Sequence, residues 1–249
     1  MTPQKLVDFT NKDGNILLLT APSATPEQAR ELARELDIDL PPRDFVAVDH
    51  FNADTLAEEN SKHDLILIPR PARSDKSQNY FSPKGFKNDA FIAFRGAGHS
   101  LGNRPLLFPI LSASRTAYTY DTKEEFGYAE DPSSAGTQMH YVTGLQARNN
   151  ARVTVAGSVD MFSDEFFGME VKPAGGEVQG TANRAFAREI SQWTFKEIGI
   201  VKVVEVRHYL ANRTDAEVNP HMYRVKNDVV SMMGTLREID ADRDIDFQH

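Results

Sequence analysis

Residues 139–167 constrain the fold more than any other part of the chain. They read MHYVTGLQARNNARVTVAGSVDMFSDEFF, in which two apolar runs flank the polar centre RNN. Runs of this length, rich in β-branched residues, predict strands at 139–145 and 152–156 joined by a turn. The second strand ends at Gly157, in the manner of a strand that enters a loop at the carboxyl edge of a parallel sheet. Ser163 then has the position of a helix N-cap, so the segment predicts an α/β fold.

The chain before this segment alternates strand and helix signals. A helix is predicted to begin at Pro26, with Thr25 as its N-cap, and to end before the Pro-Pro pair that follows. Residues 105–111 are ambiguous, because Pro109 argues against an uninterrupted helix. Short apolar runs predict five strands, at residues 15–21, 45–51, 64–70, 90–94 and 116–120.

The pattern changes in the last fifth of the chain. Residues 183–197 predict an amphipathic helix with its apolar residues on one face. After it, residues 200–210 and 228–240 predict strands with no helix between them. We therefore expect an α/β domain at 1–199 and the beginning of a β-rich domain at 200–249. Two strands are too few for an independent sheet, which predicts that the second domain is truncated.

Composition argues against several functional classes. The 249 residues carry a net charge of −8 and no basic run that would neutralise several phosphates, so nucleic-acid binding is not expected. Cysteine is absent, which excludes disulfides, thiolate zinc sites and a cysteine nucleophile. The seven histidines lack metal-ligand spacing, and neither a metal nor a cofactor is predicted. The apolar runs are too short to span a bilayer, so membrane attachment would need a segment absent from this chain.

Ser100 raises an enzymatic alternative. The sequence GHSLG around it matches G-x-S-x-G, the turn that exposes the nucleophilic serine of α/β-hydrolases, and an apolar strand candidate precedes it. Asp160 and then His208 or His221 follow in the chain order of that fold. The segment after Gly102 argues against this turn, because it carries two prolines where a helix must begin. The non-catalytic alternative is an ordinary turn whose glycines adopt positive φ.

Three further patterns each leave alternatives open. The glycines in residues 96–102 suggest a phosphate-binding loop, although their spacing is not G-x-G-x-x-G and no Lys-Ser/Thr follows. Asp160, Asp164 and Glu165 cluster at a strand-to-helix junction, where they would bind a cation, act as acid and base, or simply cap the helix. Asn212 begins the N-glycosylation sequon Asn-Arg-Thr.

Residues 144–167 also resemble a known family. The string LQARNNARV, the Gly-Ser pair after the second strand and the FSDEFF block are similar to the 48 kDa subunit of the endoplasmic-reticulum oligosaccharyltransferase. SQWTFKE at 191–197 resembles the helix that follows in that family, and VDH at 48–50 and FRGAG at 94–98 match weaker blocks in the same order. The signature residues are Gln146, Arg148, Asn149, Asn150, Gly157, Ser158 and Asp164.

The resemblance implies a non-catalytic structural subunit that assembles with and stabilises the catalytic transmembrane subunit and its neighbours, which transfer a lipid-linked oligosaccharide to asparagine. It implies the luminal part of a single-pass type I membrane protein of the endoplasmic reticulum. It further implies a flavodoxin-like three-layer domain, here incomplete at its N-terminus, followed by a β-rich domain. No catalytic residues carry over, and the signature residues are expected to be structural. Binding of glycan or donor by the loop at 158–164 is a further possibility, and Asn212 would be a possible glycosylation site.

Overall fold

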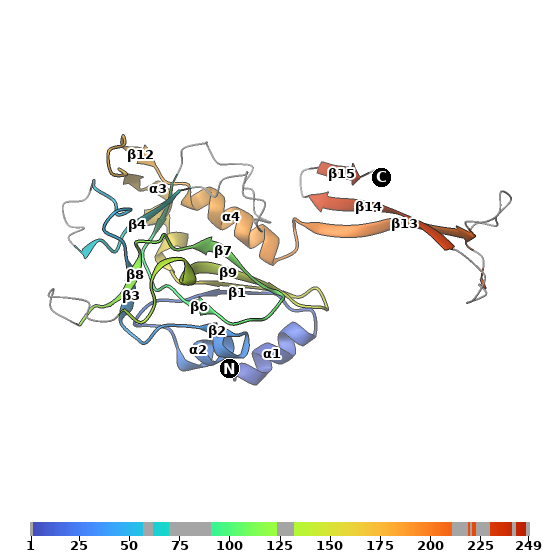
Figure 1. Ribbon diagram of the computed structural model, residues 1–249, viewed down its shortest axis with the longest axis horizontal. Helices are drawn as coiled ribbons and strands as arrows, with labels where there is room; N and C mark the ends of the chain where they lie inside the picture. Colours follow the sequence, from blue (N-terminus) through green and yellow to red (C-terminus); the bar gives the residue numbers. More distant parts are fainter. Residues whose placement is uncertain are drawn as a thin grey trace. The chain divides into compact units, whose positions relative to one another are not determined.

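A computed structural model describes the protein at residues 2–56, 62–69, 91–123, 132–210, 219, 221–222, 230–240 and 243–247. The chain divides into two compact units, Met1–Phe195 and Lys196–His249. The possible glycosylation site Asn212 lies outside the described residues. The first unit contains both helices and strands, and the mixed α/β class predicted from the sequence is confirmed (Figure 1).

The strands and helices predicted for the first unit are present, and most of them are shorter than predicted. In chain order, the elements of this unit are α1 (Pro3–Asn11), β1 (Ile16–Leu19), α2 (Glu27–Glu35), β2 (Ile38–Asp39), β3 (Phe45–Val48), β4 (Ile66–Pro69), β5 (Phe91–Phe94), β6 (Ser100–Leu101), β7 (Leu107–Ser112), β8 (Tyr118–Asp121), η2 (Gly136–Gln138), β9 (His140–Gln146), β10 (Arg152–Ala156), η3 (Asp160–Phe162), α3 (Asp164–Gly168), β11 (Glu170–Val171), β12 (Gln179–Gly180) and α4 (Asn183–Thr194).

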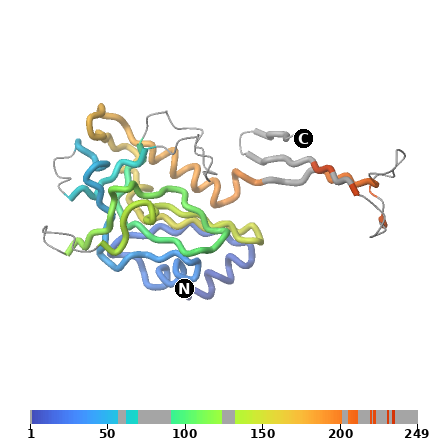
Figure 2. Tube along the Cα trace, viewed as in Figure 1, coloured from blue at the N-terminus to red at the C-terminus, as the bar shows by residue number. Residues whose placement is uncertain are grey.

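A four-stranded sheet in the order β1-β10-β9-β7 forms the centre of the unit. β1 runs parallel to β10, with Ile16 opposite Val153, whereas β9 is antiparallel to both β10 and β7. The parallel pair joins segments far apart in the sequence, the blue and yellow-green parts of the trace in Figure 2. β7 lies at the edge and its register shifts after Pro109, which fits the tolerance of edge strands for proline. The ambiguous residues 105–111 therefore contribute an edge strand.

Helices cover both faces of this sheet. In Figure 1, α1 and α2 lie on one side of it and α4 on the other. Because side chains alternate along a strand, Val153 and Val155 pack in one cluster with Leu32 of α2. Ala156 packs on the opposite face, in a second cluster with Phe186 of α4. Both valines are fully buried, and each contributes about 1.5–3 kcal/mol to folding.

α4 is the amphipathic helix that the sequence predicts. Phe186, Ile190 and Trp193 are buried along one face. The helix ends at Thr194, earlier than predicted, because Lys196 adopts a left-handed φ of 63° at the position where helices commonly stop. Within the residues that the structure describes, no helix is long and apolar enough to cross a membrane.

The N-cap predicted for the earlier helix is wrong. α2 begins at Glu27, and Pro26 occupies its N-cap position without a side-chain hydrogen bond. Thr25 Oγ1 instead accepts a hydrogen bond of 2.8 Å from the Ala21 N–H and donates one of 2.7 Å to the Ala21 carbonyl oxygen. The hydroxyl thus closes the turn after β1, a local contact that competes with helix capping.

The second unit contains an antiparallel sheet. Its order is β13 (Ile200–Leu210), β14 (Val230–Asp240) and β15 (Arg243–Phe247). β13 and β14 fall within the predicted strands. β15 was not predicted, because three of its five residues are charged and its apolar signal is weak.

Candidate functional site

The polar turn between β9 and β10 holds the first helix against the sheet. Asn150 has a φ of 68°, in the left-handed region that asparagine tolerates better than most residues. Its Oδ1 accepts a hydrogen bond of 2.6 Å from Gln146 Nε2. Asn149 Nδ2 donates to the carbonyl oxygen of Thr10, near the end of α1, at 2.7 Å. Arg148 is exposed and has no hydrogen bond or ion pair with any residue that the structure describes.

We expect Asn150→Val to lower the free energy of unfolding by about 1–3 kcal/mol, because a β-branched residue is strained at positive φ. Circular dichroism should show a melting temperature lower by roughly 3–10 °C. Asn150→Gly is the matched control, since glycine loses the same hydrogen bond to Gln146 but accepts the backbone conformation. Equal losses in the two variants would mean that backbone strain is not the cause.

Arg152 is a buried cation at the start of β10. Its Nη1 donates to the carbonyl oxygen of Trp193, at the C-terminal end of α4, at 2.7 Å. The guanidinium carbon lies 4.7 Å from the centre of the Trp193 ring, and burial lowers the pKa of the side chain. The contact joins the sheet to the end of a helix dipole that favours positive charge. The sequence alone predicted no role for Arg152. Because residues two apart on a strand share a face, Arg152 and Thr154 both lie on the face of the sheet that α4 covers.

Gly96 and Gly157 mark the place where the loops after β5 and β10 meet. The Ala97 N–H donates to the Gly157 carbonyl oxygen at 2.8 Å, and the Gly157 N–H donates to that of Tyr141 at 2.8 Å. A Cβ atom on Gly157 would lie 1.9 Å from the Ala97 carbonyl oxygen, and one on Gly96 would lie 2.1 Å from that of Gly157. Both positions therefore require glycine. Because these N–H groups bond within the protein, the phosphate-binding interpretation of residues 96–102 gains no support.

Ser158 and Asp164 belong to the capped turns that follow β10. Ser158 is buried, and its Oγ accepts a hydrogen bond of 3.1 Å from the Met161 N–H. Asp164 is the exposed first residue of α3, and the Oγ of Ser163 accepts from the Phe166 N–H at 3.4 Å. The predicted N-cap at Ser163 is thus confirmed, and Asp164 complements the helix dipole. In the described part of the chain, no three His, Cys, Asp or Glu side chains could together hold a metal ion.

Ser100 does not form a nucleophile turn. It lies in β6, paired antiparallel with Asp39 of β2, and the next element is strand β7. The preceding His99 is fully buried, with its Nε2 2.7 Å from Thr143 Oγ1, and burial lowers its pKa to about 3. His208 belongs to β13 in the second unit. The serine hydrolase alternative is therefore not supported, because a strand follows the GHSLG segment where that fold needs a helix.

Asp49, directly after β3, joins that strand to the connection between β7 and β8. Its carboxylate is fully buried and accepts hydrogen bonds from the Ser114 hydroxyl, from Thr116 Oγ1 at 2.9 Å and from Asn52 Nδ2 at 2.8 Å. The Phe51 N–H adds a fourth donor at 3.0 Å. Burial by itself raises the pKa of this carboxyl, but the hydrogen bonds together outweigh it and hold the pKa below its usual value.

The network around Asp49 predicts a pH-dependent contribution to stability. Since its folded-state pKa lies below the usual 3.8, the ionised carboxylate stabilises the fold above that pH and loses this effect as the pH falls through the folded-state value. We expect Asp49→Asn to cost about 1–3 kcal/mol near neutral pH. In urea titrations, the difference between wild type and variant should shrink below about pH 4. A constant difference from neutral to acid pH would contradict the prediction.

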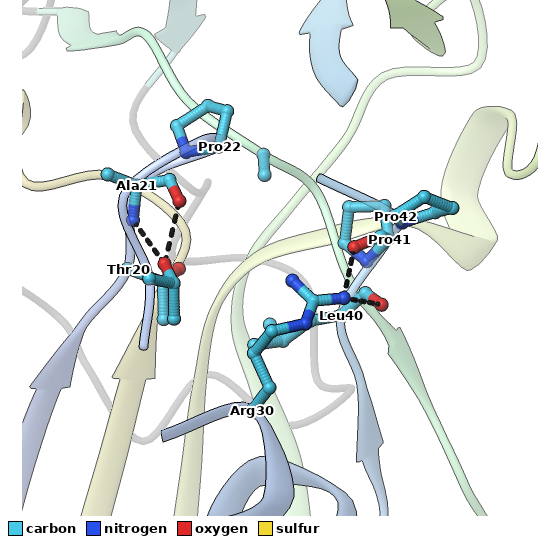
Figure 3. A pocket seen from close by; sticks show the side chains of 9 residues that line it. Thr20, Ala21, Pro22, Arg30, Leu40, Pro41 and Pro42 are labelled. Carbon is cyan, nitrogen blue, oxygen red and sulfur yellow. Dashed lines mark hydrogen bonds between the residues drawn. The ribbon is translucent and has the colours of Figure 1, made fainter. Parts of the chain in front are cut away.

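A small pocket lies beside the carboxyl end of β1 (Figure 3). Its lining residues are Thr20, Ala21, Pro22, Thr25, Arg30, Leu40, Pro41, Pro42 and Ala97. Its free volume is about 10 Å³, which suits one water-sized group. Sites for small organic ligands and cofactors enclose roughly 300–1,000 Å³. The pocket is thus placed where ligands of open α/β sheets bind, but it is too small for a nucleotide or a sugar.

Comparison with known proteins gives consistent matches. The model of the family "OST48, N-terminal domain" matches residues 1–197. The Schizosaccharomyces pombe protein named dolichyl-diphosphooligosaccharide–protein glycosyltransferase subunit wbp1 is 31% identical over 229 residues, which cover 92% of this chain and 49% of that protein. The 48 kDa subunits of the same enzyme from Arabidopsis thaliana and Caenorhabditis elegans are 30% and 31% identical, over 91% and 92% of this chain and 50% of each relative.

The chain therefore spans about half the length of the curated relatives it matches. Among solved structures, the mmIFT52 N-terminal domain superposes with a TM-score of 0.48 at 15% sequence identity. That superposition covers 77% of this chain and 69% of the other.

Proposed function

Because the chain belongs to the OST48 family, whose N-terminal domain matches residues 1–197, we propose that it is part of a non-catalytic structural subunit of the oligosaccharyltransferase. The family match carries this proposal, and the names of the curated relatives support it. In this role the protein assembles with the catalytic transmembrane subunit and neighbouring subunits, and it stabilises the catalytic subunit during N-linked glycosylation.

The contacts of the signature residues support a scaffolding role. Gln146 and Asn150 bond each other within the turn, and Asn149 fastens α1 to that turn. Gly157 permits two loops to approach closely, and Ser158 begins the capped turn after β10. The hydrogen bond of Asn149 and the close approach at Gly157 connect separate parts of one domain, and the other contacts order single turns, which supports a structural role for these residues.

The proposal includes the location of the protein and its domain plan. We place it in the lumen of the endoplasmic reticulum, as part of a single-pass type I membrane protein anchored by a segment outside this chain. We divide it into an α/β domain at 1–199 and the beginning of a β-rich domain at 200–249, with Asn212 as a possible glycosylation site. Helices on both faces of the sheet support the flavodoxin-like layering, whereas the antiparallel strand β9 departs from an all-parallel sheet.

Affinity purification of the longer protein that carries this chain tests the proposal. The catalytic subunit and activity toward peptides with an Asn-X-Ser/Thr sequon should be recovered together with it. Purification of a folded protein without either would contradict the proposed function. Arg148→Glu is an informative companion, because Arg148 is exposed and has no hydrogen bond or ion pair with a residue that the structure describes. A variant with unchanged melting temperature but lost recovery of the catalytic subunit would identify the turn as a subunit contact.

A further inference from the structure

Arg30 is half-buried, and no carboxylate in the part of the chain that the structure describes neutralises its positive charge. One terminal nitrogen, Nη2, donates to the carbonyl oxygens of Leu40 at 3.2 Å and Pro41 at 2.5 Å. In Figure 3 the other terminal nitrogen turns away from these carbonyls, toward the opposite wall formed by Ala21 and Pro22. No ion pair of Arg30 exists among the described residues. A partly desolvated cation with only neutral partners is stabilised further when an anion binds it.

Two ion pairs involve residues that are close in sequence to the pocket lining. Arg43 Nη2 lies 3.5 Å from Glu27 Oε2, and Lys123 Nζ lies 2.6 Å from Asp44 Oδ2. Each of these pairs is neutral overall. Arg30 is the one charged residue among those that line the pocket, so the complementary ligand is an anion.

The size and the walls of the pocket restrict which anion fits. The free volume of about 10 Å³ admits one oxygen atom, so only the tip of an anionic group enters the pocket. Pro22, Pro41 and Pro42 form part of the wall, and proline has no backbone N–H to offer a phosphate. Their rigid apolar rings instead suit the methylene groups of an acidic side chain, and guanidinium groups pair well with carboxylates.

We infer that this pocket anchors one aspartate or glutamate side chain of a polypeptide partner, with Arg30 as the residue that binds the carboxylate. The site goes beyond the proposed role in the oligosaccharyltransferase and does not depend on it, because its chemistry can be tested on this chain alone. A single anchored side chain contributes specificity and register to an interface more than affinity.

The test is a nuclear magnetic resonance titration of the whole chain with N-acetyl-aspartate methylamide at constant ionic strength. The Arg30 Nε–H and the amides of Ala21 and Ala97 should shift saturably, with a dissociation constant on the order of 10 mM for so small a ligand. The uncharged N-acetyl-asparagine methylamide should cause no saturable shift. Absence of shifts with the aspartate probe, or equal shifts with both probes, would overturn the inference.

Inorganic phosphate separates a polypeptide anchor from a site for free anions. Phosphate binding tighter than the aspartate probe at the same amides would overturn the assignment to a side chain. Arg30→Gln should abolish the shifts while its amide can still donate to Pro41, and Arg30→Lys should keep part of them. Arg34→Gln, on the same helix and outside the pocket lining, is the control that should bind like the wild type. If Arg30→Gln does not fold, the comparison of the aspartate and asparagine probes on the wild type still tests the inference.

Discussion

Gly157→Ala should lower the free energy of unfolding by at least about 3 kcal/mol. The added Cβ would lie 1.9 Å from the Ala97 carbonyl oxygen, a distance that no methyl group tolerates. The obstacle is backbone, so it cannot rotate away as a side chain could. The two loops must separate, and separation breaks the hydrogen bond of 2.8 Å from the Ala97 N–H to the Gly157 carbonyl oxygen. We expect the variant to be mostly unfolded, or to melt at least roughly 6–12 °C lower.

Gly168→Ala is the control for this result. Gly168 ends α3, and a Cβ atom placed there would meet nothing within 4 Å. Alanine favours the helical backbone over glycine, so this variant should be neutral or more stable by up to about 1 kcal/mol. Thermal melts of both variants under the same conditions separate a steric effect from a general cost of replacing glycine. A Gly157→Ala protein within about 1 kcal/mol of wild type would mean that the two loops are not in contact.

The sequence predicted the elements whose signals are local. The strands at β9 and β10, the turn between them and the buried face of α4 follow from apolar periodicity and turn residues that lie next to one another in the chain. Pro109 was harder, because a proline excludes a helix but is accepted by an edge strand, and only the sheet order tells which strand is at the edge. Thr25 was misassigned because a hydroxyl near a helix start can bond the preceding turn as well as cap the helix.

The candidate site depends on partners that are distant in the sequence. Asp49 receives hydrogen bonds from Ser114 and Thr116, which lie 65 and 67 positions away, and no local pattern announces them. Arg152 reaches Trp193 across 41 positions. In the sequence, Arg30 looks like an ordinary surface residue of a helix. Its hydrogen bonds to the carbonyl oxygens of Leu40 and Pro41 appear only in the folded chain. Such contacts become visible once the register of the sheet is known, because the register determines which side chains share a face.

Arg152→Met should lower the free energy of unfolding by about 2–4 kcal/mol. The guanidinium donates a charge-assisted hydrogen bond to the Trp193 carbonyl oxygen, worth roughly 1.5–3 kcal/mol, and its position over the Trp193 ring adds up to about 2 kcal/mol. Removal of a buried cation recovers part of this loss, since burial disfavours the charged form, as the lowered pKa indicates. Methionine keeps most of the apolar contact with the ring, so the measured loss reports mainly the polar contacts.

Arg148→Met provides the matched comparison, because it makes the same substitution at the exposed arginine of the adjoining turn. Arg148 has no described hydrogen bond or ion pair, so its variant should stay within about 0.5 kcal/mol of wild type. Amide hydrogen exchange gives a local measurement. In Arg152→Met, the exchange rate should rise first in the last turn of α4, before it rises in any other helix. Equal stability of the two variants would mean that Arg152 does not hold α4 to the sheet. A larger loss at Arg152, confined at first to α4, would establish that this buried arginine joins α4 to the sheet.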